Sequence, residues 1–201
     1  MDKKAFYKLT YGLFLLTARE GEKDNGCIIN TAIQVANDPA RISIAVLKGN
    51  HTHDMVLRTG SFTVSSISTA AEFALFQRFG MQSGRDTDKF AGFEAVERFS
   101  NGLYYLTKGA NMAMSAKVVN TMDLGSHTLF VAEVTDAKIL GEEPSCTYAY
   151  YQSDIKPQKK EEKKKGWVCT VCGYVYEGDP LPEDFICPWC KHGAEDFVRQ
   201  Q

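Results

Sequence analysis

Long apolar runs are missing from this sequence of 201 residues, and no segment approaches the ~20 apolar residues that a membrane-spanning helix needs. The start of the chain, residues 1–21, places lysines before a short apolar run, as a signal peptide does. Thr10 and Gly12 interrupt that run, however, and Arg19 stands where a small-residue cleavage site would be expected. We therefore expect a helix that leads into a first strand, in a cytoplasmic protein without a membrane partner.

An excess of charge of one sign is also missing. The formal net charge of −2 argues against a nucleic-acid partner. The charge is unevenly placed, since residues 156–165 hold six lysines and two glutamates, a net charge of +4, whereas residues 166–201 carry a net charge of −4. A charged run without an apolar face cannot bury enough surface to order itself. We predict a domain over residues 1–155, a flexible linker over 156–165 and a small domain over 166–201.

Cysteines are too few for a disulfide framework, because the chain has six in 201 residues. Four of them form two CxxC pairs that are separated by fourteen residues. These four are Cys169, Cys172, Cys187 and Cys190. Four thiolates can close a tetrahedral site around zinc or iron, and the spacing alone leaves both metals open. The other two, Cys27 and Cys146, are expected to be small buried hydrophobic residues.

The first 155 residues have the alternation and composition of strands. Strands are predicted at 14–19, 27–35, 41–48, 61–68, 103–109, 112–119 and 127–140, with a turn at 24–26. One helix is predicted from Thr52 to Gly60, and a second from a capping box of Thr69 and Glu72 to Gly80. Many antiparallel strands with a few short helices favour a mainly β fold, a closed barrel with a Greek-key path.

The segment KGNHTHDMV has the features of an anion site. It ends a predicted strand and enters a helix, where free backbone amides and the helix dipole favour a negative charge. Lys48 adds a positive charge, Asn50 and Thr52 add donors, and Gly49 allows close approach of the backbone. The alternative is an ordinary strand-to-helix turn with Thr52 as the N-cap, and the segment by itself leaves both interpretations open.

The wider pattern resembles the flavin reductase family of FMN-binding split β-barrels. The resemblance covers residues 5–140 and rests on GCIINTAIQVANDPARISIAVLKGNHTHDMV, GSFTVSSIS and GSHTLFVAEVTDAKI in this order. It implies a homodimer that binds one FMN per subunit near the dimer interface, with NAD(P)H as the co-substrate. The sequence lacks a GxGxxG motif behind a strand, so NAD(P)H would not be held in a Rossmann domain. It also lacks a paired-carboxylate or Ser-His-Asp pattern, which is consistent with hydride chemistry supplied by a flavin.

The same resemblance implies the site residues. The positions beside the isoalloxazine ring are Asn30, Thr31 and Ala32. Those that bind the ribityl chain and the phosphate are Lys48, Asn50, His51 and Thr52, and one of the two histidines His51 and His53 is expected to contact ligand. His127 occupies the position of a family histidine near the nicotinamide side of the flavin. The chain has Ile28 where family members often carry a threonine.

The C-terminal segment resembles rubredoxin, through CTVCGYVY, GDP, ICPWC and a closing phenylalanine. A zinc ribbon would share the two metal knuckles, but a rubredoxin also has an aromatic cluster that keeps the metal in a dry shell. Here the aromatic residues are Trp167, Tyr174, Tyr176, Phe185, Trp189 and Phe197. The resemblance therefore favours one iron over zinc. It also implies a positive φ at Lys191, where the knuckle normally has glycine.

The combination of the two parts resembles the high-molecular-weight rubredoxins. This resemblance implies a path for electrons from NAD(P)H through FMN and iron to an external terminal reductase of the flavodiiron type, which reduces oxygen or nitric oxide. Two alternatives stay open at this point. The chain could be a flavin reductase that releases reduced FMN and has a zinc-binding docking tail, or an electron carrier whose FMN never meets NAD(P)H.

Overall fold

The structure is a computed structural model that describes residues 1–157 and 166–200. The chain divides into two compact units, Met1–Lys156 and Pro157–Gln201. Residues 158–165, which make up most of the expected linker, lie outside the described residues. Among the described residues, no helix is long and apolar enough to cross a membrane.

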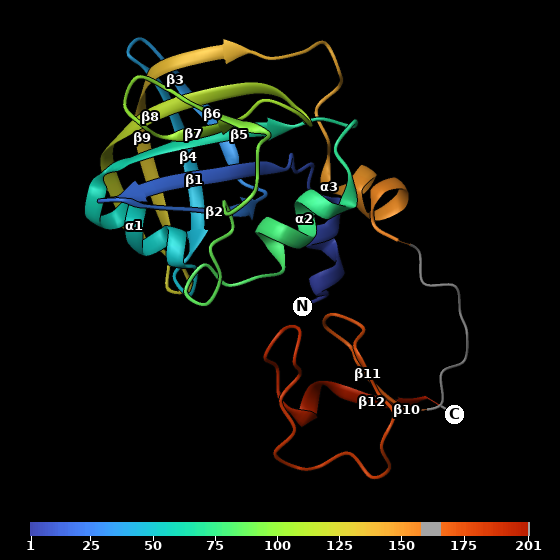
Figure 1. Cartoon of the computed structure of the whole chain (residues 1–201). Coiled ribbons are helices and arrows are strands. Elements are labelled where there is room, and N and C mark those ends of the chain that lie inside the picture. The colour runs from blue at the N-terminus through green and yellow to red at the C-terminus, as the bar shows by residue number, and fades with distance from the viewer. Residues whose placement is uncertain (158–165, 201) are drawn as a thin grey trace. The chain divides into compact units, whose positions relative to one another are not determined.

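The first unit is built on a sheet of seven strands in the order β2-β1-β5-β8-β9-β4-β3 (Figure 1). These strands are β1 Phe14–Glu20, β2 Lys23–Ile29, β3 Ala32–Asn37, β4 Ala40–Leu47, β5 Ser61–Ile67, β8 Ala110–Asp123 and β9 His127–Ile139. The outermost strands β2 and β3 are joined by Asn30 and Thr31 alone. A connection this short spans at most roughly 10 Å, so the two ends of the sheet must meet. The sheet is thus curled into a barrel, and the prediction of a mainly β barrel is confirmed.

The first hairpin differs from its prediction. The turn expected at residues 24–26 is wrong, because Asp24, Asn25 and Gly26 lie inside β2 and pair with β1. The turn consists instead of Gly21 and Glu22, and Gly21 has a φ of +59° that glycine adopts without strain. The single strand expected over 27–35 is likewise wrong, since it is broken between β2 and β3 where the barrel closes.

Helices α1 and α2 pack against the barrel, and α1 begins earlier than predicted whereas α2 begins later. Helix α1, His51–Thr59, starts after the N-cap Asn50 rather than at Thr52, and it ends as expected at Gly60, whose φ is +66°. Helix α2, Phe73–Gly80, has Glu72 as its N-cap, so the capping box expected from residue 69 does not form. The start of the chain forms a short 3₁₀ helix, η1 Lys3–Lys8, in place of an α-helix.

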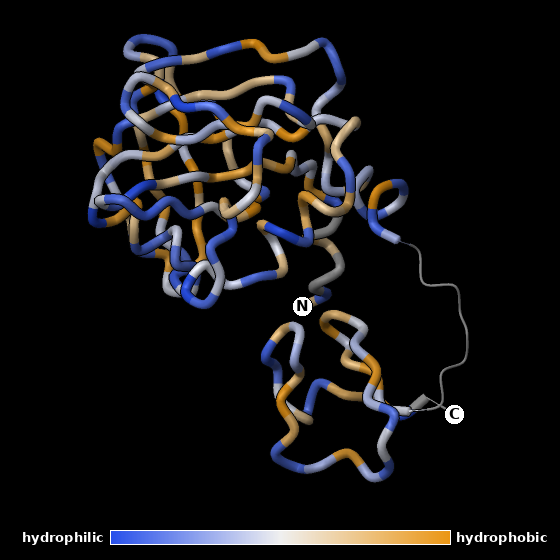
Figure 2. Tube along the Cα trace, viewed as in Figure 1, coloured by the Kyte–Doolittle hydropathy of each residue, from blue (hydrophilic) through white to orange (hydrophobic). Residues whose placement is uncertain are grey.

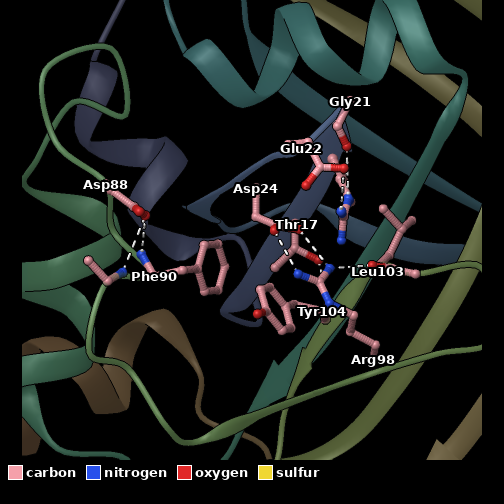
Figure 3. Close-up of polar contacts among 12 residues, drawn as sticks. Thr17, Gly21, Glu22, Asp24, Asp88, Phe90, Arg98, Leu103 and Tyr104 are labelled. Atoms are coloured by element: carbon pink, nitrogen blue, oxygen red, sulfur yellow. Dashed lines mark hydrogen bonds and ion pairs between the residues drawn. The ribbon is translucent and has the colours of Figure 1, made fainter.

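A small hairpin that lies on the outside of the barrel was only half predicted. It consists of β6 Val96–Arg98, which no pattern indicated, and β7 Tyr104–Leu106. Arg98 forms an ion pair with Asp24 of β2, at 2.8 Å between Nη2 and Oδ2 (Figure 3). Its guanidinium also lies 3.6 Å from the ring centroid of Tyr104. Thr17 Oγ1 of β1 donates to the Tyr104 carbonyl at 2.5 Å. The hairpin is thus hydrogen bonded to β1 through Tyr104 and ion paired with β2 through Arg98.

Strand β1 is buried on both of its faces. Leu16 belongs to a cluster inside the barrel, with Phe62 and Phe130, whereas Leu15 belongs to a second cluster under α2, with Phe79. Figure 2 accordingly shows hydrophobic stretches that recur within the strands of the barrel. The second cluster also receives two short C-terminal helices that were not predicted, α3 Tyr148–Tyr150 and the π-helical η2 Tyr151–Ile155.

The second unit has a three-stranded sheet in the order β11-β10-β12. Its elements are β10 Gly166–Cys169, β11 Val175–Tyr176, the 3₁₀ helix η3 Ala194–Asp196 and β12 Phe197–Gln200. Its core combines the four cysteines with aromatic side chains. The prediction of a small metal-knuckle domain fits this arrangement.

Candidate functional site

The four predicted cysteines converge on one centre. Cys169 Sγ lies 3.6 Å from Cys190 Sγ, and Cys172 Sγ lies 3.4 Å from Cys187 Sγ. All four sulfur atoms lie within 4.8 Å of one another. A tetrahedral metal with bonds of about 2.3 Å to sulfur needs sulfur–sulfur separations of roughly 3.8 Å. The four sulfur atoms therefore fit one metal ion.

Backbone amides point at these sulfur atoms in the same pattern in both knuckles. In each pair the first cysteine accepts two amide hydrogen bonds and the second accepts one. The donors are Val171, Cys172, Tyr174, Trp189, Cys190 and His192. Burial raises the pKa of the Cys187 thiol, but its two amide donors and its cysteine neighbours outweigh burial and leave the pKa at about 7. The pKa of the Cys169 thiol is also lowered, whereas burial raises the pKa of the Cys172 thiol to about 12 and that of the Cys190 thiol above its usual range. The two amide donors therefore favour the thiolate, which is the metal-binding form, at the first cysteine of each pair.

Each knuckle turns through a residue of positive φ. In the first knuckle this is Gly173, with a φ of 77°, whose amide donates to the Cys169 carbonyl at 2.8 Å. In the second it is Lys191, with a φ of 63°, whose amide donates to the Cys187 carbonyl at 2.9 Å. The positive φ predicted for Lys191 is confirmed, and the sulfur hydrogen bonds of its knuckle match those of the other knuckle.

Most of the predicted aromatic residues pack beside the centre. Phe185 lies at the middle of the cluster, with ring centroids 4.6 Å from Tyr176 and 5.3 Å from Phe197. Trp189 departs from the expectation of a dry shell, because 65% of it is exposed. Its ring touches the cluster only edge-on, at 5.4 Å from Tyr174.

In the barrel, β4 brings together residues that the flavin resemblance selected. Thr31 lies against one edge of β4, where its Oγ1 donates to the Ala45 carbonyl at 3.0 Å. His127 lies against the other edge, opposite Leu47. Because Ala45 and Leu47 are two residues apart, they share one face of β4. Thr31 and His127 therefore flank the same short stretch of strand, and Asn30 and Ala32 stand beside Thr31 in the chain.

Lys48 follows at the end of β4. Its amide donates to the Ser126 carbonyl at 3.0 Å, and its Nζ forms an ion pair with Asp123 Oδ1 at 2.7 Å. Lys48 lowers the pKa of the Asp123 carboxyl below its usual range, mainly through this hydrogen bond. Both groups are exposed, so an anion can compete for the lysine.

The first turn of α1 presents backbone donors rather than the expected hydroxyl. The side chain of Thr52 is completely buried and accepts a hydrogen bond from Asn25 Nδ2 at 3.0 Å. Asn50 Nδ2 lies 3.7 Å from the sulfur of Cys27, which is buried as predicted. The His53 amide donates to the Asn50 carbonyl at 3.1 Å. The amides before it stand at the N-terminus of the helix, where backbone amides in general lack an acceptor within the helix and can bind an anion.

The two histidines of α1 have different surroundings. His53 is only 4% exposed, and both ring nitrogens are hydrogen bonded, to Asp54 Oδ1 at 3.0 Å and to Thr128 Oγ1 at 2.9 Å. His51 Nδ1 is buried and has no hydrogen-bond partner in the part of the chain that the structure describes. Burial lowers the pKa of His51, which favours the neutral ring. Of the two, His51 is the one with an atom left for a ligand.

Arg85 and Lys89 make contacts with the barrel that the sequence did not predict. Arg85 Nη2 reaches Asp54 Oδ2 at 2.7 Å, which extends the hydrogen-bond chain through His53 to Thr128. Lys89 is buried and donates to the carbonyls of Gly26 at 2.9 Å and of Phe79 at 3.2 Å. The sequence contains no signal for either contact, because the partners are separated by between 10 and 75 residues.

Comparison with known proteins matches two family models to separate parts of the chain. The model of the flavin reductase like domain matches residues 6–158, and that of the rubrerythrin, rubredoxin-like domain matches residues 167–198. A high molecular weight rubredoxin of Moorella thermoacetica is 34% identical over 98% of this chain and 99% of its own length. A ferric-chelate reductase (NAD(P)H) of Archaeoglobus fulgidus is 36% identical over 75% of this chain and 89% of its own.

Solved structures agree in fold. The FMN-binding protein of Thermus thermophilus superposes with a TM-score of 0.60 at 22% identity, over 67% of this chain and 73% of that one. BorF, the flavin reductase component of a bacterial two-component tryptophan halogenase, superposes with a TM-score of 0.65 at 21% identity, over 73% and 90%. The first unit therefore has an FMN-binding flavin reductase fold, and the second supplies four cysteines for one iron.

Proposed function

The chain belongs to the flavin reductase-like family and has a C-terminal rubredoxin-like domain, and from this premise we propose that it relays electrons from NAD(P)H to a terminal reductase. The proposed path runs through FMN in the barrel and one iron held by the four cysteines. The observation that carries the proposal is that one chain contains both a flavin reductase fold and a four-sulfur centre of metal-binding geometry. When bound, FMN accepts a hydride and can release its electrons singly, whereas a four-thiolate iron site carries one electron at a time.

The proposed flavin contacts follow the positions described above. We assign the phosphate to Lys48 and to the backbone amides of His51 and Thr52, because a positive charge there stands beside a helix N-terminus. His51 would add its Nδ1, which has no hydrogen-bond partner among the described residues, and Asn50 would add its amide side chain. Asn30, Thr31 and Ala32 would lie beside the ring system, and His127, across β4 from Thr31, would face the nicotinamide. These assignments fit the donor set of the barrel end and remain a proposal.

A homodimer is part of the proposal. The outer face of β3, β4, β9 and β8 exposes Ile33, Leu47 and Met122. Strand register places them together, since Ile33 pairs with Ser43 of β4 and Met122 pairs with Leu129, which pairs with Ala45. A second copy of the chain would bury this apolar face beside Lys48 and His127. Ile33→Glu with Met122→Glu should then give a monomer in analytical ultracentrifugation.

The terminal acceptor that we propose is a flavodiiron-type reductase, as the resemblance to the high-molecular-weight rubredoxins suggests. The sulfur separations by themselves suit zinc as well as iron, and the match to the rubredoxin-like family is what assigns iron. A tail that held zinc would instead make the chain a flavin reductase with a zinc-binding docking tail, which is the second candidate function.

Visible spectra of the purified protein test these proposals. A ferric four-thiolate centre is coloured, whereas a zinc centre is colourless. We expect the colour in the purified protein, and its loss together with the oxidised flavin absorption when NADH or NADPH is added without oxygen. A colourless, zinc-containing tail would favour the second candidate. A flavin that neither nicotinamide reduces would indicate an electron carrier that receives its electrons elsewhere.

A further inference from the structure

His53 is a buried titratable residue that the proposed relay does not use. It lies in the first turn of α1, next to the residues to which the phosphate is assigned, but it is only 4% exposed. Both ring nitrogens are taken by neighbours, Nδ1 by Asp54 Oδ1 at 3.0 Å and Nε2 by Thr128 Oγ1 at 2.9 Å. The ring also packs edge-on against Phe130, with ring centroids 5.7 Å apart. No atom of His53 is left for a ligand, so its role must lie in the groups that it joins.

Asp54 and Arg85 determine how the ring of His53 is presented to Thr128. Arg85 Nη2 lies 2.7 Å from Asp54 Oδ2, and hydrogen bonds from His53 and from Arg85 lower the pKa of this carboxyl. An ionised carboxylate can only accept hydrogen bonds, so Nδ1 of His53 carries a proton and Nε2 is left for Thr128. A carboxylate that holds one ring nitrogen in this way fixes both the tautomer and the orientation of an imidazole.

The hydrogen bond between His53 and Thr128 joins α1 to β9. The helix packs mainly against two other strands, β1 and β2. Its side chains are hydrogen bonded to these strands through Arg58, which donates to β1, and Thr52, which accepts from β2. Within the described part of the chain, no other hydrogen bond connects α1 with β9. The position of the helix relative to β9 therefore depends on His53.

Thr128 stands beside residues that belong to the other half of the proposed flavin site. Its neighbour in the chain is His127, which is assigned to the nicotinamide side. In the sheet, Thr128 pairs with Val46 of β4, two residues before Lys48, and with Asp123 of β8, the ion-pair partner of Lys48. The hydrogen bonds of His53 thus connect the helix turn assigned to the phosphate with the strand that carries His127. A ligand that contacts both elements binds more tightly when their separation is already fixed.

We infer that His53 is a positioning residue of the flavin site, and that its hydrogen bond to Thr128 holds the first turn of α1 at the distance from β9 that FMN requires. This inference rests on the proposed function, since it takes the phosphate to bind at α1 and the nicotinamide to face His127. His53 itself contacts neither ligand and transfers neither a proton nor an electron. Asp54 and Arg85 act one step further away, because they orient the ring of His53.

Two amide side chains separate the two hydrogen bonds of His53. The amide of glutamine reaches the position of Nε2, whereas that of the shorter asparagine reaches only the position of Nδ1. His53→Gln should therefore keep the link to Thr128 and leave the Kd of FMN close to that of the parent protein. His53→Asn keeps only the bond to Asp54 and should raise this Kd about threefold to tenfold, the factor that corresponds to one neutral hydrogen bond. Titration of FMN fluorescence with the full-length protein measures both values.

Thr128→Val removes the same hydrogen bond from the side of the strand. It should raise the Kd of FMN by the same factor as His53→Asn, and the double variant should raise it no further, because all three lose one shared link. The rate of flavin reduction at saturating NADH or NADPH should fall in the same variants. Val64→Ala, in the same core, should lower the urea midpoint without a change in the Kd of FMN. Multiplied effects in the double variant, or equal Kd values for His53→Gln and His53→Asn, would overturn the inference.

A measurement without flavin keeps the inference separate from the proposed function. In the FMN-free full-length protein, Thr128→Val should shift the amide resonances of His51 and Thr52, at the other end of the link. Val64→Ala should leave these two resonances unchanged. Unshifted resonances in Thr128→Val would overturn the inference even if NAD(P)H reduces the flavin. If the resonances shift and the Kd values follow the expected order, but neither nicotinamide reduces the flavin, the relay is refuted and the positioning role of His53 stands.

Discussion

Lys48→Ala separates the proposed phosphate site from the stability of the barrel. Lys48 Nζ makes an exposed ion pair with Asp123, so the substitution should change the free energy of unfolding very little. If Lys48 binds the flavin phosphate, the loss of a charge-assisted hydrogen bond should cost about 1.5–3 kcal/mol of binding, or roughly tenfold to a hundredfold in Kd. Titration of FMN fluorescence at constant ionic strength, beside urea unfolding of the FMN-free protein, measures both quantities.

Asp123→Asn is the matched control for this prediction. It removes the same ion pair but keeps the lysine, which then has no carboxylate competing with the phosphate. FMN binding should therefore be as tight as in the parent protein or tighter. Equal FMN affinity in Lys48→Ala and the parent protein would show that Lys48 does not bind the phosphate. Equal weakening in both variants would mean that the ion pair itself shapes the site.

Three further predictions concern the barrel core, the pH dependence and the metal. Thr52→Val should lower the free energy of urea unfolding by about 1–3 kcal/mol, because it leaves the buried Asn25 amide without its acceptor. FMN affinity should be retained, because the phosphate is proposed to bind the backbone amide of Thr52 and not its hydroxyl. A large loss of FMN affinity would refute this. Hydrogen bonds from His53 and Arg85 hold the pKa of Asp54 below its usual 3.8. The ionised carboxyl therefore stabilises the barrel fully above pH 3.8, and this stabilisation is lost as the pH falls through the lowered pKa. Asp54→Asn should accordingly flatten the acid side of the stability profile, and an unchanged profile would contradict the assignment. Removal of the metal should unfold the tail, seen as loss of its dispersed amide resonances, while the urea transition of the barrel stays unchanged.

The sequence was most informative where chemistry is local. The two CxxC pairs and the glycine-like position of Lys191 determine both knuckles within a few residues, and the structure agrees with them. The hairpin turn was misplaced because residues 24–26 have turn chemistry, yet pairing with β1 places them within a strand. Tertiary burial outweighed their local preference.

Side-chain partners across the barrel could not be predicted. Lys48 and Asp123 are 75 residues apart, and they meet only because β4, β9 and β8 are neighbours in the sheet. Thr52 looked like a phosphate ligand because a hydroxyl at a helix N-terminus often is one. Thr52 lies instead on the face of α1 that packs against the barrel, where its side chain is buried and contacts Asn25.

The central claim is that both halves of the chain act as one relay, and the order of iron reduction tests it most directly. NAD(P)H is mixed anaerobically with the intact protein, and with protein that has been cut between residues 156 and 165, over a range of protein concentrations. The iron absorption should bleach at a rate independent of concentration in the intact protein, because the linker keeps the tail near the flavin at an effective concentration in the millimolar range. In the cut protein the rate should become proportional to the concentration of tail, while flavin reduction is unchanged. Second-order bleaching in the intact protein as well would contradict the relay and leave two independent electron carriers in one chain.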